Sequence, residues 1–186
     1  MAILSSLIQS ETFDLGELCL ACGLCCNGVI FADVKLEPED NAARLRALGL
    51  PVSRPCSSAG APRFTQPCAA LEGCRCRVYA DRPKYCRQFE CVLFKSVAAG
   101  CTEPAEALRI IRTARKRAGK VGRLLRALGD ADEDVSLSIR FRRTAKRLQQ
   151  TDLAEETAET YGELTLAVHD LNLLLGEAFY PGRRET

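Results

Sequence analysis

Thiols crowd into two short stretches of this 186-residue chain. The first, "CLACGLCC", begins at Cys19 and places four cysteines within eight positions. The second, "CAALEGCRCRVYADRPKYCRQFEC", runs from Cys68 to Cys91 and holds five more. A thiolate is a strong, soft ligand, and two residues between cysteines let one tight loop direct both sulfurs at one metal. The spacing therefore indicates metal chelation rather than the burial of small apolar side chains.

The first stretch has a ferredoxin-like start with a different end. Cys19, Cys22 and Cys25 repeat the two-residue spacing, as in the bacterial ferredoxin pattern. Cys26 follows at once, where that pattern has three residues and then Cys-Pro. Adjacent side chains of an extended backbone point apart. We therefore expect a second metal centre, or a bridging thiolate, to account for Cys25 and Cys26.

The second stretch combines a rigid turn with an ambiguous pair of thiols. Cys-x-Cys is a less usual chelating spacing, so one of Cys74 and Cys76 can be a bystander. Pro83 restricts Arg82 to an extended conformation, which suits a turn that presents Cys86.

Cations surround these sulfurs. They are Arg75, Arg77, Arg82, Lys84 and Arg87. A four-thiolate zinc or iron–sulfur centre carries net negative charge, which nearby cations offset. We expect Arg77, Arg82 and Arg87 to lie beside the bound cofactor.

A disulfide framework is the alternative use of so many cysteines. It usually comes with an even count and a signal peptide, whereas this chain has eleven cysteines and starts "MAILSSLIQSETFDLGE". That start has no basic segment, and its brief apolar run is followed by acids. No stretch approaches the ~18 apolar residues of a membrane span. We therefore expect a reducing, cytoplasmic location, where clustered cysteines bind metal more often than they pair.

The two cysteine motifs together resemble a known family. "CxxCGLCC" followed by "CRVYADRPKYCRQFEC" is similar to the CxxCxxCC, or YkgJ-like, family of zinc- or iron-chelating cysteine-cluster proteins, over residues 19 to about 95. The resemblance implies two sets of four ligands, drawn from Cys19, Cys22, Cys25, Cys26, Cys68, Cys76, Cys86 and Cys91. It leaves Cys56, Cys74 and Cys101 as free thiols. It brings no settled activity and leaves zinc and iron both open.

The donor types favour iron over zinc. Structural zinc sites often include histidine, and iron–sulfur clusters rarely do. The only histidine, His169, lies far from the cysteines in the sequence. We expect iron–sulfur centres of the [4Fe–4S] type, two in number, with two zinc ions as the alternative.

Three classes of function remain open. The favoured one is a metal-binding protein for electron transfer or redox sensing. The second is a zinc-stapled interaction protein with a basic helical face, and the third is a cluster-dependent enzyme. The sequence has no Gly-rich nucleotide loop and no Ser/His/Asp arrangement, so it names no catalytic residue and leaves enzymatic activity undecided.

The elements that must position these thiols suggest a mainly α fold. An irregular cysteine-rich metal-binding half, residues 1–100, is expected to pack on a small C-terminal helical bundle, residues 101–186. In the first half we expect a short helix or arm over residues 3–9 and an irregular loop over 19–28. A strand over 28–36, a helix over 37–50 and a loop over 51–67 follow.

Three helices are predicted after Glu103, over about 103–128, 135–150 and 151–180. Pro104 suits the first turn of the first helix, Gly129 its end, and Thr151 or Asp152 the cap of the third. Apolar residues recur three or four apart in two stripes, from Ile111 to Leu128 and from Tyr161 to Ala178. The stripes are expected to pack on each other and on the cysteine-rich half. The expected contacts in that half are Phe89, Leu93 and Phe94.

Charge is uneven along the helical region. Residues 109–126 carry eight Arg or Lys and no acid, whereas residues 152–177 carry seven acids and no Arg or Lys. A basic helical face can follow a nucleic-acid backbone. Because the net charge is only +2 and no nucleic-acid motif is present, we favour basic helices that pack beside the acidic one. A redox or protein partner is expected but not identified.

Overall fold

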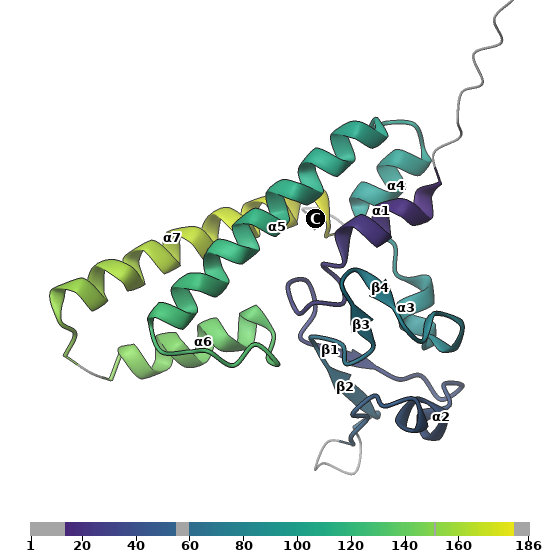
Figure 1. Cartoon of the computed structure of the whole chain (residues 1–186), viewed down its shortest axis with the longest axis horizontal. Coiled ribbons are helices and arrows are strands. Elements are labelled where there is room, and N and C mark those ends of the chain that lie inside the picture. The colour runs from purple at the N-terminus through teal and green to yellow at the C-terminus, as the bar shows by residue number, and fades with distance from the viewer. Residues whose placement is uncertain (1–13, 55–59, 151, 181–186) are drawn as a thin grey trace, which may run out of the picture.

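The computed structural model describes residues 14–54, 60–150 and 152–180 (Figure 1). In this part of the chain the fold is mainly α, as predicted, with only short strands. The helices are α1 (Leu15–Cys22), α2 (Ala42–Ala47), α3 (Lys84–Gln88), α4 (Val92–Ala98), α5 (Pro104–Ala127), α6 (Leu137–Leu148) and α7 (Glu155–Ala178). The strands are β1 (Asp33–Lys35), β2 (Arg63–Thr65), β3 (Leu71–Glu72) and β4 (Arg75–Cys76), and a 3-10 turn spans Tyr79–Asp81.

The two longest helices, α5 and α7, pack along each other (Figure 1). The predicted stripes form this contact. The buried residues of α5 are Ala107, Ile111, Ala114, Ala118, Val121 and Leu125, and those of α7 are Leu164, Ala167, Leu171 and Leu175. Alanines on the α5 side let the two helices approach closely.

The predicted boundaries of these helices are mostly correct. Pro104 opens α5, and Gly129, at φ 83°, follows its end in the left-handed conformation that favours glycine. The predicted cap of α7 by Asp152 is wrong, because α7 begins at Glu155 after Ala154, which has no capping side chain. Thr151, the other candidate cap, lies outside the described residues, as does the predicted arm over 3–9.

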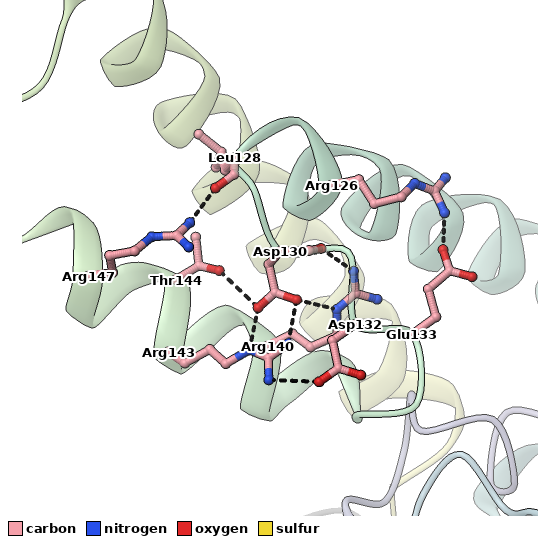
Figure 2. A network of polar contacts seen from close by, with 9 residues as sticks. All are labelled: Arg126, Leu128, Asp130, Asp132, Glu133, Arg140, Arg143, Thr144 and Arg147. Atoms are coloured by element: carbon pink, nitrogen blue, oxygen red, sulfur yellow. Dashed lines mark hydrogen bonds and ion pairs between the residues drawn. The ribbon is translucent and has the colours of Figure 1, made fainter.

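A buried ionic network fixes the turn between α5 and α6 (Figure 2). Asp130 is 5% exposed and accepts from Arg140 Nε at 3.1 Å, and Arg140 itself is 3% exposed. Arg143 donates to the same carboxylate at 2.6 Å and also pairs with Asp132. Thr144 donates to it at 3.4 Å. Because both cations come from α6, one carboxylate holds that helix against the end of α5.

Two small antiparallel sheets and a separate core organise the cysteine-rich half. β1 pairs with β2, opposing Val34 to Phe64, and β3 pairs with β4. The predicted strand over 28–36 is therefore reduced to 33–35, and residues 51–67 are not loop throughout because 63–65 form β2. Val34 and Phe64 are buried with Leu45 of α2 in this second core. Burial of alternate residues explains why such short strands form.

The helical region covers the cysteine-rich half at several points. Leu18, Leu24 and Leu93 are buried in the same core as α5 and α7, so the predicted contact through Leu93 is confirmed. Phe89 lies instead in an aromatic cluster, with its ring 4.8 Å from that of Phe31. Phe94 is half-buried.

Backbone hydrogen bonds tie the two regions further. Val92 N–H donates to the Phe179 carbonyl at 3.3 Å, and Leu137 N–H donates to the Gly28 carbonyl at 3.0 Å. Gly28 has φ 81°, and a Cβ there would lie 3.0 Å from Ser136 Cα. The first cysteine stretch can therefore approach α6 only with glycine at this position. None of the described helices is both long and apolar enough to cross a membrane.

Candidate metal centre

The first cysteine stretch begins as a helix and ends as a turn. Asp14 Oδ1 accepts from Gly16 N–H at 2.8 Å and caps α1, while Leu18 anchors the helix in the core. Cys19 and Cys22 are three residues apart and therefore share one face of α1. Gly23, at φ 67°, ends the helix. The expectation of an irregular loop over 19–28 is thus wrong for 19–22, because a cap and a buried leucine outweigh the poor helix propensity of cysteine.

The second stretch is joined to the first by a backbone hydrogen bond. Cys68 N–H donates to the Cys26 carbonyl at 2.8 Å. The β3–β4 hairpin follows and turns at Gly73, which has φ 62°. This hairpin places Cys76 on β4, close to the start of the stretch.

Two short helices present the last two thiols. Pro83 precedes α3, whose middle carries Cys86, in agreement with the rigid turn predicted there. Cys91 precedes α4, and its sulfur accepts from Phe94 N–H at 3.4 Å. A thiolate at this position gains from the N-terminal end of the helix dipole.

Cys91 lies with the thiols of the first stretch. Desolvation, followed by the nearby thiolates of Cys25 and Cys91, raises the pKa of Cys19 to about 11. Desolvation raises the pKa of Cys22 to about 12, and the same two thiolates contribute. We call Cys19, Cys22, Cys25 and Cys91 the first thiol group.

The remaining four predicted ligands form a second neighbourhood. Desolvation, then the thiolates of Cys68, Cys25 and Cys76, raises the pKa of Cys86 to about 12. Desolvation likewise raises the pKa of Cys68, with Cys76 contributing. The hydrogen bond with Cys25 and desolvation raise the pKa of Cys26, and the thiolates of Cys68 and Cys86 contribute. We call Cys26, Cys68, Cys76 and Cys86 the second thiol group.

Cys25 and Cys26 lie where the two thiol groups meet. Their sulfurs are 3.6 Å apart, and Cys26 N–H donates to the Gly23 carbonyl at 3.0 Å within a turn. The extended backbone assumed for this pair is therefore wrong. The hydrogen bond between the thiols lowers the pKa of Cys25 to about 7 and raises that of Cys26. Of this pair, Cys25 is therefore the thiol that ionises first.

The three candidate arginines have different surroundings. The charge of Arg82 counteracts the desolvation that raises the pKa of Cys19 and Cys86 and adds to the lowering at Cys25, so Arg82 lies near both thiol groups. Its guanidinium is held 3.7 Å above the Tyr79 ring.

The other two candidate arginines have different partners. Arg77 pairs with Glu72 at 3.3 Å, and its charge counteracts the desolvation that raises the pKa of Cys68. Arg87 lines a hollow of about 200 Å³ together with Arg82, Asp40 and Arg44. Of the three arginines, Arg82 is thus the one placed to offset charge on both groups.

Sequence reasoning missed Arg115 of α5. Its Nη1 donates to the carbonyls of Cys22 at 2.9 Å and Ala21 at 3.3 Å, which are unsatisfied at the end of α1. The same nitrogen lies 2.6 Å from Cys74 Sγ. Cys74 also fills the space beside Gly23, where an added Cβ would be 3.3 Å from its sulfur. Nothing in the basic run of α5 marks Arg115, because its partners are more than 40 residues away.

The donor set fits a thiophilic metal. In the described residues, the charged groups that shift the thiol pKa values are other thiolates and arginines. Soft, all-sulfur surroundings suit zinc or iron–sulfur clusters. No three Cys, His, Asp or Glu side chains of this part of the chain are already gathered tightly enough to hold one ion. Metal binding would release the thiol protons.

Comparison with known proteins gives one match. The model of a family described as "CxxCxxCC: Putative zinc- or iron-chelating domain" matches residues 18–114, which include both cysteine stretches and the start of α5. No curated protein and no solved structure matches the chain.

Proposed function

The chain belongs to the CxxCxxCC family of putative zinc- or iron-chelating domains, and from this membership we propose that it holds two iron–sulfur centres of the [4Fe–4S] type. The first thiol group would hold one centre and the second thiol group the other. When bound, such a centre supplies one-electron redox chemistry. The proposed role is electron transfer or redox sensing.

The proposal is supported by the thiols that gather around Cys25 and Cys26, whose sulfurs are 3.6 Å apart, and the proposed division gives four of the eight predicted ligands to each centre. Cys91 is distant in sequence from Cys19 and Cys22 but contributes to the pKa of both. Four thiolates are the usual complement of a [4Fe–4S] cluster. The family description leaves zinc and iron open, and the absence of histidine from the ligand set favours iron.

The protein's own groups would stabilise these centres in two ways. Desolvation of Cys22 and Cys86 makes their free thiolates costly, so a bound cation is favoured over an empty, ionised site. Arg82 would offset the residual negative charge of both centres from its position against Tyr79. Charge near a cluster also tunes its reduction potential.

A zinc-stapled protein is the second candidate. A structural zinc ion takes four ligands, and four cysteine thiolates are one such set. Each thiol group offers four thiols, so two zinc ions would also suit the arrangement. In this case the metals would be structural, and the protein would work through its surface.

Purification without oxygen separates the two candidates. We expect a brown protein with broad visible absorption and with iron and acid-labile sulfide for two clusters per chain. A colourless protein containing two zinc ions would overturn the iron–sulfur proposal in favour of the second candidate. One cluster or one zinc ion per fully loaded chain would overturn the two-centre arrangement.

Cysteine variants test the grouping. Cys91→Ser should lose the first centre and Cys86→Ser the second, so each should retain about half of the metal. Cys74→Ser is the matched control, since Cys74 lies two residues from Cys76 but outside both groups, and it should keep all of the metal. Equal loss from Cys74→Ser and Cys86→Ser would contradict the ligand set.

A further inference from the structure

The outward face of α5 carries a line of cations. Arg112, Lys116 and Arg123 are exposed, and their spacings of four and seven residues place them on one face of the helix. We call these three residues the α5 stripe. From its first to its last residue the stripe extends roughly 16 Å, at 1.5 Å per residue.

Most other cations of the helical region have partners in the structure. Lys120 pairs with Glu163 of α7 at 2.8 Å, and Arg126 pairs with Glu133. Arg117 donates to the Asp170 carbonyl at 2.7 Å. α7 therefore provides partners for Lys120 and Arg117 of α5, in line with the expectation that basic and acidic helices pack together.

Two cations of α6 also have an acidic partner, because Arg140 and Arg143 both bind Asp130 (Figure 2). The α5 stripe is different. Within residues 14–54, 60–150 and 152–180, its three cations form no hydrogen bond or ion pair. Ion pairs therefore account for Arg140 and Arg143 of α6 but for none of the three stripe cations.

Repulsion between the like charges of the α5 stripe also destabilises helix α5. Arg112 and Lys116 are four residues apart, as are Lys116 and Lys120, and like charges at this spacing repel. No acid lies between Arg109 and Arg126 to relieve the repulsion within the helix. Local conflict of this kind, without a compensating contact, is typical of a functional surface.

The chemistry of the face favours a phosphate backbone over an acidic protein. The large hydrophobic side chains that are exposed in the described residues are Leu20, Tyr79, Tyr85, Leu166 and Leu173, and none belongs to α5. Protein interfaces have an apolar, often aromatic, centre. A row of cations without such a centre suits contacts to phosphates, which need charge and no apolar pocket.

We propose that the α5 stripe binds the phosphate backbone of a nucleic acid without reading its sequence. Phosphates of one strand are about 3.4 Å apart along a duplex, so the stripe spans roughly five of them. Base-edge and stacking contacts are not part of the proposal, since the stripe has neither amide nor aromatic side chains. The stripe contains none of the predicted metal ligands, and the proposal holds for either metal.

The test is fluorescence anisotropy with labelled DNA and RNA, as single strands and as duplexes, and with metal-loaded protein. We compare the wild type with R112E/K116E/R123E. The matched control is K35E/R54E/K95E, which reverses three exposed cations of the cysteine-rich half. A neutral triple variant, R112Q/K116Q/R123Q, guards against charge reversal disturbing the fold. Metal content and circular dichroism are recorded for every variant.

We expect wild-type Kd values of ~10⁻⁶ to 10⁻⁴ M, which weaken as salt increases. Both stripe variants should bind at least tenfold more weakly, and the control within threefold of the wild type. Loss of three phosphate contacts should reduce the slope of log K against log salt by about 2.7 on duplex DNA.

Three outcomes would overturn the proposal. They are no binding at about 50 mM salt, equal loss in the stripe and control variants, or an unchanged salt slope in folded stripe variants. Stronger binding to polyglutamate than to any nucleic acid would replace it with an acidic-protein surface. None of these outcomes depends on whether the metal is iron or zinc, so the metal proposal stands or fails separately.

Discussion

The two hydrophobic cores of this molecule are formed by different kinds of secondary structure. The first core takes its buried side chains from long helices, α5 and α7, together with Leu18 and Leu93 of the cysteine-rich half. The second core lies wholly in the cysteine-rich half, between Val34 and Val78, on three-residue strands and one short helix. In the described residues it has eight buried side chains against sixteen in the first core.

The difference shows where stability must come from. Each buried Leu or Ile contributes about 1.5–3 kcal/mol, so regular stripes on long helices can hold the first core together. The second core has half as many buried residues and carries three predicted ligands on its edge, Cys68, Cys76 and Cys86, whereas the larger first core carries two, Cys22 and Cys91. Structural zinc in small peptides contributes ~10–16 kcal/mol. We infer that the second core depends on metal and the first does not.

Removal of metal should have the largest effect, because it should unfold the second core and leave the first core folded. After chelation without oxygen, we expect residues 33–86 to become sensitive to protease, because the thiols no longer hold their loops. The helical signal of α5–α7 should survive in circular dichroism. Collapse of all helicity would mean that the two cores form one cooperative unit. The predicted division of the chain into 1–100 and 101–186 would then be wrong.

Asp130→Asn should cause the next largest effect, in the helical region only. The change leaves Arg140, which is 3% exposed, without a carboxylate. Breaking a buried ion pair in this way costs about 3–5 kcal/mol. Chemical denaturation should show the loss, while the metal content stays unchanged. Asp132→Asn is the control, because that residue is exposed and its pair contributes about 0–1 kcal/mol.

Acid should reduce the stability that Asp130 contributes through its ion pairs with Arg140 and Arg143. Hydrogen bonds from Arg143 and Arg140 hold the pKa of Asp130 at about 2, below its ordinary value of 3.8. A lowered pKa contributes stability above the ordinary value, and this contribution is lost as pH falls from about 4 through 2. The shift corresponds to about 2 kcal/mol. Wild-type protein should lose this amount over that range, and Asp130→Asn should not.

Leu164→Ala should destabilise the first core without changing metal binding. Leu164 is fully buried where α7 faces α5. Truncation should lower the free energy of unfolding by about 2–5 kcal/mol and leave metal content unchanged. Leu166→Ala, at a side chain that is 67% exposed, should change it by less than about 0.5 kcal/mol. Metal loss from Leu164→Ala would contradict the independence of the first core.

Cys101→Ser should have the smallest effect. Cys101 is exposed and its sulfur makes only a long contact, 3.8 Å, to the Ala99 carbonyl. We expect a change under ~1 kcal/mol in stability and full metal content. A loss of metal comparable with that of Cys86→Ser would show that the ligand set is incomplete.

Much of the helical fold could be predicted from sequence, because its signals are local. The apolar residues of α5 from Ile111 to Leu128 recur over about five turns, and Pro104 and Gly129 mark the ends of the helix. The α1 helix was missed because its stability comes from Leu18, whose partners lie on distant helices. The strand at 63–65 was missed for a similar reason, since its pairing with 33–35 joins segments 30 residues apart.

The metal-binding region was predictable in composition but not in arrangement. Spacing identified the thiols, yet it could not place Cys91 beside Cys19, which requires the chain to return after α3. It likewise gave no sign of Arg115, whose partners are carbonyls and carry no sequence pattern. Among the cations near the motif, spacing did not distinguish Arg82 from Arg87.

The hydrogen bond from Val92 to Phe179 has a consequence for the order in which the protein is made. All eleven cysteines precede α5 in the chain, whereas Phe179 follows α7, and Tyr180 also donates to the Ile30 carbonyl at 3.2 Å. A ribosome adds about 5–20 residues per second, so roughly 4–18 seconds separate the synthesis of Cys91 from that of Tyr180. During this interval the thiols exist without the helix that closes over residues 30 and 92. Metal delivered on the nascent chain would reach them before that closure, whereas metal delivered later must pass the finished fold.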